Sequence, residues 1–101
     1  MRRYEMMILI TDTLDEEAAQ AVFARAKDVL AQQGGQVLDE AWWGRRKLGY
    51  EIDHRDHGYY GVLDLEATSE AVAELERQLK ISDDVVRFKT VRPEVRVRKA
   101  G

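Results

Sequence analysis

The residues best suited to binding a ligand form a cationic run, Arg45-Arg46-Lys47, near the middle of the chain. Three adjacent cations repel one another, and no stretch of acidic residues lies beside them to neutralise the run. A polyanion would relieve this repulsion, so the run favours binding to phosphate groups. The alternative is that these charges only solvate an exposed face of the fold.

Aromatic residues surround the cationic run and could add stacking to its electrostatic attraction. An exposed aromatic ring can stack on a nucleobase. Aromatic side chains are more often buried in a core, so we expect at least three of the five rings to be buried. The five residues are Trp42, Trp43, Tyr50, Tyr59 and Tyr60.

Catalytic and metal-binding chemistry has little support in the sequence. The chain contains no cysteine, which excludes disulfides, thiol nucleophiles and Cys-ligated metals. His54 and His57, with Asp53 and Asp56 beside them, could offer metal ligands, but a loop lacks the fixed spacing of a helix and no third strong ligand is placed. We therefore expect a protein that is not an enzyme, with no metal, no cofactor and no small-molecule substrate.

Length and composition indicate one globular domain. The chain has 101 residues, of which 45% are hydrophobic and 35% are charged, and it has a single proline. A chain of this size can bury one core, and its composition argues against disorder. The apolar run over residues 6–10 is too short for a signal peptide or a membrane span, so we expect a soluble, cytoplasmic protein.

Hydrophobic periodicity and turn signals divide the chain into six elements. They are a strand over 2–10, a helix from a capping box at 13–16 to Gly34-Gly35, an extended region over 36–53 interrupted at Gly44, a strand over 59–66, a helix that Thr68 or Ser69 caps and that ends near 81–83, and a strand over 85–92. Residues 53–58 are expected to form a polar loop. The order is β-α-β-β-α-β.

This order predicts an α+β, ferredoxin-like fold. Right-handed crossovers would place both helices on one face of a four-stranded antiparallel sheet. The domain should span residues 1–93, and residues 94–101 should form an extended basic tail. Because this fold hosts many unrelated activities, it does not by itself define a function.

Charge is distributed unevenly over these elements. The formal net charge is -3, and residues 11–40 and 64–84, which include the helices, each hold two basic and seven acidic side chains. Residues 85–101 hold six basic side chains and one acidic side chain. If even-numbered strand residues face the helices, the open face should be positive. Its cations would be Arg3, Arg45, Lys47, Arg87 and Lys89.

Four segments, in order, resemble the bacterial small-subunit ribosomal protein six family over essentially the whole length of the chain. They are MRRYE at residues 1–5, WGRRKLGYEI at 43–52, HGYY at 57–60 and SDDVVRF at 82–88. The resemblance implies a ferredoxin-like fold and a structural role without enzyme activity. It also implies binding to the central domain of 16S ribosomal RNA together with small-subunit ribosomal protein eighteen.

The resemblance, together with the strand alternation, nominates two sets of contact residues. The cations expected to bind RNA are Arg2, Arg3, Arg45, Arg46, Lys47, Arg87, Lys89 and Arg92. The residues of the open face expected to meet the protein partner are Met7, Leu9, Tyr60 and Val62. The competing hypothesis is a ferredoxin-like domain that binds an effector or oligomerises through the same face and does not bind RNA.

Overall fold

The computed structural model describes the backbone of residues 1–52 and 55–92, and the side chains of residues 1–47 and 57–92. Its elements are β1 (Arg2–Thr11), α1 (Glu16–Gln32), β2 (Gln36–Ile52), β3 (Arg55–Ala67), α2 (Ser69–Ile81) and β4 (Val85–Val91). The predicted order is confirmed. The largest boundary difference is in β3, which begins four residues before Tyr59 and takes in part of the predicted loop; the other strand ends differ by one residue at most.

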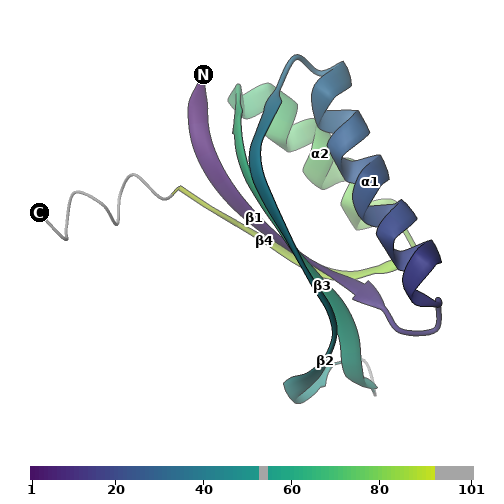
Figure 1. Ribbon diagram of the computed structural model, residues 1–101. Coiled ribbons are helices and arrows are strands. Elements are labelled where there is room, and N and C mark those ends of the chain that lie inside the picture. The colour runs from purple at the N-terminus through teal and green to yellow at the C-terminus, as the bar shows by residue number, and fades with distance from the viewer. Residues whose placement is uncertain (53–54, 93–101) are drawn as a thin grey trace, which may run out of the picture.

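The four strands form one antiparallel sheet in the order β2-β3-β1-β4. Both helices pack on the same side of this sheet and leave the other side open (Figure 1). The predicted α+β, ferredoxin-like fold is therefore confirmed. None of the helices in the described part of the chain is long and apolar enough to cross a membrane.

The core lies between the helices and the sheet, as the periodicity predicts. In β1 the even-numbered residues from Tyr4 to Ile10 are buried in it. The helices contribute the apolar stripe that is expected at three- and four-residue spacing. Its buried members are Ala19, Val22, Phe23, Ala26, Val29 and Leu30 in α1, and Ala71, Val72, Leu75 and Leu79 in α2.

Side-chain caps begin both helices. The carboxylate of Asp15 accepts a hydrogen bond from Ala18 N at 2.8 Å, so Asp15 caps α1. The predicted capping box at 13–16 is wrong by two residues, since the backbone N–H of Thr13 bonds to the hydroxyl of Thr11 instead. Thr68 caps α2 by accepting from Ala71 N.

Two strands extend beyond the rest of the sheet. The last pair between β1 and β3 is Thr11 with Gly58, whereas β2 and β3 continue to pair as far as Ile52 and Arg55. They form a two-stranded arm that projects past the helices (Figure 1). The cationic run lies at the base of this arm, because Arg46 pairs with Gly58.

Candidate functional site

Pairing across the sheet arranges the open face into rows. Residues directly opposite each other in antiparallel strands have their side chains on the same face. Taken from β2 towards β4, the rows are Gln36, Glu66 and Arg3; Asp39, Asp64, Glu5 and Val91; Ala41, Val62, Met7 and Lys89; Gly44, Tyr60, Leu9 and Arg87; and Arg46, Gly58 and Thr11.

Cations gather at the end of the open face from which the arm projects. Arg46, Arg87 and Lys89 are exposed and belong to the last three rows. No acidic residue lies in these rows. We call these three residues the basic end. They are placed to attract phosphate groups, because charges more than a Debye length of about 8 Å away are largely screened at physiological salt.

The predicted face is wrong for all three residues of the cationic run, because even-numbered Arg46 was expected to face the helices and its two neighbours the open face. Arg45 pairs with the core residue Tyr59, and Lys47 pairs with His57 two positions before it, so both lie on the side of the sheet that carries the helices. The cause is a β-bulge at Trp43, where the register shifts by one residue. One extra residue exchanges the faces of all residues that follow. Arg46 takes the place on the open face.

A glycine makes this bulge possible. Gly44 has a φ of 76°, in the left-handed region that glycine adopts without steric penalty. A second register shift lies between Val37 and Asp39. The interruption that the sequence predicts at Gly44 is confirmed, but its effect on the direction of later side chains was not foreseen.

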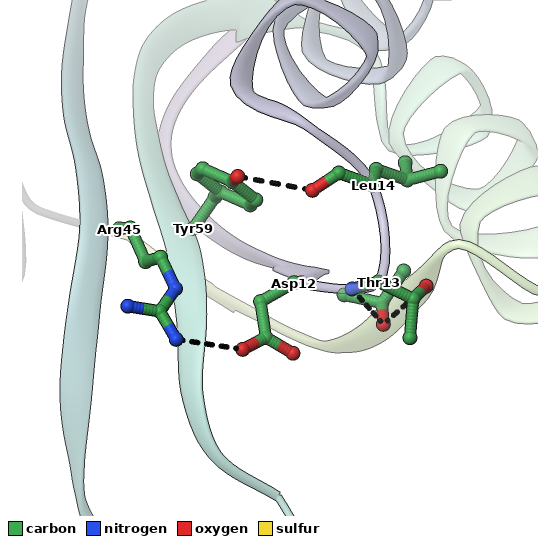
Figure 2. Close-up of polar contacts among 6 residues, drawn as sticks. Asp12, Thr13, Leu14, Arg45 and Tyr59 are labelled. Carbon is green, nitrogen blue, oxygen red and sulfur yellow. Dashed lines mark hydrogen bonds and ion pairs between the residues drawn. The ribbon is translucent and has the colours of Figure 1, made fainter.

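The connection between β1 and α1 holds the base of the arm in place. A guanidinium nitrogen of Arg45 donates to the carboxylate of Asp12 at 3.2 Å, and the hydroxyl of Tyr59 donates to the carbonyl of Leu14 at 3.0 Å (Figure 2). The indole N–H of Trp42 donates to the carboxylate of Glu16 at 2.9 Å. Arg45 therefore has an intramolecular partner that balances its charge.

The bulge turns an aromatic and cationic pair outward. Trp43 is 47% exposed, and its ring lies 6.1 Å from that of Tyr60 on the open face. The guanidinium of Arg46 lies over the Trp43 ring at 5.8 Å, and its Nε donates to the Trp43 carbonyl. This contact holds Arg46 close to an exposed indole at the basic end.

Most of the aromatic residues around the run are less buried than predicted. Tyr59 is buried, Trp42 and Tyr60 are partly buried, and Trp43 is exposed. The side chain of Tyr50 lies outside the described residues. At most two of the five rings can therefore be buried, and the expectation of three or more is wrong. Trp43 is exposed because it is the extra residue of a β-bulge in β2, which is an edge strand of the sheet.

The middle of the open face is apolar. Met7 is 37% exposed, Val62 and Tyr60 are partly exposed, and Leu9 is only 3% exposed although it lies outside the main core. Leu9 therefore packs beneath this surface and offers little area for contact with a partner. A shallow hollow of about 260 Å³ opens here. Its lining residues are Glu5, Met7, Trp43, Val62, Lys89 and Val91.

The far end of the open face is acidic, which the sequence reasoning missed. Glu5, Asp39 and Asp64 share one row, and we call them the acidic belt. Arg3, which was predicted to join a positive face, donates to Asp64 Oδ2 at 2.6 Å. The open face is therefore divided and not uniformly positive. Strand pairing was the signal that could have revealed the belt.

The remaining nominated residues lie at the margins of the site. Arg2 begins β1, Arg92 follows β4, and both are exposed. His54 and the tail over 94–101 lie outside the described residues. Among the residues that are described, no group of three or more His, Cys, Asp or Glu side chains could hold a metal ion.

The fold and this face together define a small ferredoxin-like binding domain with a cationic end and an apolar centre. The family model of ribosomal protein S6 matches residues 3–92. The chain is 46% identical to small ribosomal subunit protein bS6 of Salinispora arenicola, over 95% of this chain and 100% of that protein. It is 43% identical to the Clostridium novyi protein of the same name, over 93% of this chain and 99% of that one.

Structural similarity agrees with these matches. The crystal structure of 30S ribosomal protein S6 from Thermotoga maritima superimposes with a TM-score of 0.87 at 28% identity, covering 98% of this chain and 96% of that chain. The chain belongs to the ribosomal protein S6 family. Membership in this family of small-subunit ribosomal proteins confirms the resemblance, and it confirms that the chain is not an enzyme.

Proposed function

We propose that this protein binds the central domain of 16S ribosomal RNA together with small-subunit ribosomal protein eighteen, and that it acts in the cytoplasm as a structural part of the small subunit. Family membership supports the ribosomal setting. The observation that carries the proposal is the basic end, where Arg46, Arg87 and Lys89 are exposed on one surface.

The mechanism is positioning by electrostatic contact. Each phosphate that a cation neutralises releases condensed counterions, so the affinity should fall with rising salt. Arg46 and Arg87 suit this role because a guanidinium can donate two hydrogen bonds to one phosphate. Lys47 is exposed on the helix side of the sheet near the basic end, whereas Arg2 and Arg92 are exposed at the opposite end of the sheet, near the acidic belt.

Two of the nominated cations have a smaller part in this proposal. Arg3 and Arg45 each form an ion pair within the chain, with Asp64 and Asp12 respectively. Binding RNA through either would first require that pair to separate. The main phosphate contacts are assigned to the exposed cations of the basic end, Arg46, Arg87 and Lys89, because they share the open face.

The partner protein is assigned to the apolar centre. Met7, Val62 and Tyr60 offer exposed or partly exposed apolar surface there, and Leu9 lies beneath them. Binding of the partner beside the basic end would present two surfaces to RNA at once. This protein, whose net charge is negative, would then bind RNA more tightly without making more RNA contacts itself.

Sedimentation of the full chain with small ribosomal subunits tests the proposal. We expect the chain to travel with the subunits at moderate salt, and to form a heterodimer with protein eighteen when the two are mixed. A stable homo-oligomer that does not associate with subunits or with protein eighteen would contradict the proposal and favour the effector-binding or oligomerising domain.

A further inference from the structure

Ile81, in the last turn of α2, is an apolar residue that the fold does not bury. The core stripe of α2 contains Leu75 and Leu79. At 3.6 residues per turn, Ile81 lies about 120° around the helix from Leu75, so it points away from the core. It is 70% exposed, and it is the one exposed large apolar residue of the two helices, both of which the structure describes in full. The open face does not account for it, because the helices lie on the other side of the sheet (Figure 1).

A hollow lies beside Ile81, between the two helices. Its volume is about 240 Å³, which is below the range of roughly 300–1,000 Å³ that is typical of small-molecule sites. A space of this size suits one or two amino-acid side chains better than a ligand. Ile81 forms part of its rim, and Val85 at the start of β4 also lines it. The floor consists of buried residues, which are Val22, Ala26 and Val29 from α1 and Leu75 and Leu79 from α2.

We propose that a second copy of this chain packs here, with the Ile81 side chain of each copy in the hollow of the other. A two-fold dimer buries the same patch on both subunits, so that patch must be complementary to itself. A protruding apolar side chain next to a hollow of side-chain size meets this requirement. The proposal goes beyond the proposed function, because it concerns the free protein and leaves both open faces uncovered (Figure 1).

Two charged residues make the patch complementary in charge as well as in shape. Arg25 is the only charged residue that lines the hollow, and Asp83 follows Ile81 by two positions. Both are exposed, and neither has a hydrogen bond or an ion pair with another described residue. When Ile81 of one copy enters the hollow of the other, Asp83 of the first copy comes close to Arg25 of the second. The two-fold axis repeats this contact, so the dimer gains two ion pairs.

The other charges around the patch balance one another. Besides Asp83, the charged residues within three positions of Arg25 or Ile81 are two cations and two anions: Lys27, Asp28, Lys80 and Asp84. Charges further away are largely screened beyond a Debye length of about 8 Å at physiological salt. The net negative charge of each copy is therefore a weak obstacle to pairing at this place.

The charge of the helix side argues against other occupants. Residues 11–40 and 64–84, which include the helices, each hold two basic and seven acidic side chains. RNA and anionic lipid surfaces are repelled by such a surface. One side chain in each hollow is a small contact, so we expect a weak dimer with a Kd on the order of 100 μM.

The test measures self-association of the full chain by sedimentation equilibrium, from about 10 μM to about 1 mM protein at about 0.15 M salt. Ile81→Ser removes the side chain that enters the hollow. Met7→Ser is the control, because Met7 is an exposed apolar residue of the open face. Circular dichroism and thermal melting verify that each variant folds.

Charge variants test the second half of the proposal. Arg25→Glu and Asp83→Arg each bring like charges together across the interface, and the double variant restores both ion pairs with their signs exchanged. Relative to the wild-type dimer, we expect Ile81→Ser to associate at least about tenfold more weakly and each single charge variant at least about fivefold more weakly. The double charge variant should return to within about threefold of the wild type, and Met7→Ser should match it.

Three results would overturn the inference. The first is a wild-type chain that stays monomeric over the whole concentration range. The second is a dimer that Met7→Ser disrupts and Ile81→Ser does not, which would place the contact on the open face. The third is a double charge variant that associates no better than the single variants, because Arg25 and Asp83 would then not face each other. None of these measurements uses RNA or protein eighteen, so the inference can fail while the proposed function stands.

Discussion

Arg45 and Arg46 are adjacent cations in different environments. Arg45 points to the helix side and donates to Asp12, whereas Arg46 lies on the open face beside Trp43. Asp12 is the less exposed member of the first pair, with 19% of its side chain accessible. Arg45 therefore links the base of the arm to the β1–α1 connection, and Arg46 remains available for a ligand.

Single substitutions should separate these two roles. Arg45→Gln should lower the free energy of unfolding by at most about 1 kcal/mol, which is the usual limit for an ion pair near the surface, and should leave RNA affinity nearly unchanged. Arg46→Gln should reduce RNA affinity with little effect on stability. Urea denaturation and RNA titration measure the two quantities. Equal losses of RNA affinity in both variants would contradict the assignment.

The residue types correctly predicted which part of the sheet forms the site, but they did not predict the face on which each side chain lies. Five predicted residues do share one end or the centre of the open face: Arg46, Arg87, Lys89, Met7 and Val62. The ion pair of Arg3 with Asp64 spans 61 positions in the sequence. No local pattern predicts such a contact, because it depends on which strands become neighbours.

At the scale of the element, β2 determines which of the cations in the run point to the open face. Its bulge at Trp43 reverses the alternation and sends Arg46 to the open face. The alternation of β1 was predictable because that strand is paired on both sides and keeps its register as far as Leu9. The alternation of β2 was not, because a single extra residue shifts the phase and leaves the hydrophobic pattern nearly unchanged.

Replacing Gly44 should destabilise this bulge. An alanine held at the observed φ of 76° would be strained by about 1–2 kcal/mol, although its added carbon would meet no atom closer than 3.7 Å. We expect Gly44→Ala to lower the free energy of unfolding by about 1 kcal/mol in chemical denaturation. Gly44→Asn should lose less, because asparagine tolerates this region. If both variants are as stable as the wild type, the bulge does not depend on glycine.

Helix α2 contains a carboxyl group with a perturbed pKa. Hydrogen bonds from Arg77, and then from Gln78, lower the pKa of Glu74 from 4.5 to about 2. Because the pKa is lower in the folded state, the stabilisation from this group is fully present above pH 4.5. It is lost as the pH falls towards 2.

Titration of the Glu74 carboxyl by NMR measures this shift directly. We expect a midpoint near 2 in the wild type and a clear rise towards 4.5 in Arg77→Gln, which removes the larger cause. Arg25→Gln, on α1, serves as the control and should leave the midpoint unchanged. A wild-type midpoint close to 4.5 would show that the contact with Arg77 does not persist in solution.

At the scale of the whole molecule, charge distinguishes one side of the sheet from the other. The helical segments are acidic, and the open face is divided into a basic end, an apolar centre and an acidic belt. The fold was predictable because the order of elements and the handedness of crossovers leave few arrangements. The divided face was not predictable, because it depends on the register of three strand pairs.

The salt dependence of RNA binding tests the central claim most directly, because it counts the phosphates that the protein neutralises. The experiment uses the complex of the full chain with protein eighteen and compares Arg46→Gln/Arg87→Gln with Arg25→Gln/Lys80→Gln, which removes two exposed cations from the helices. The slope of log affinity against log salt should become shallower by roughly 2 in the first variant and stay unchanged in the second. Equal slopes and equal affinities in the wild type and both variants would contradict the assignment of RNA to the basic end.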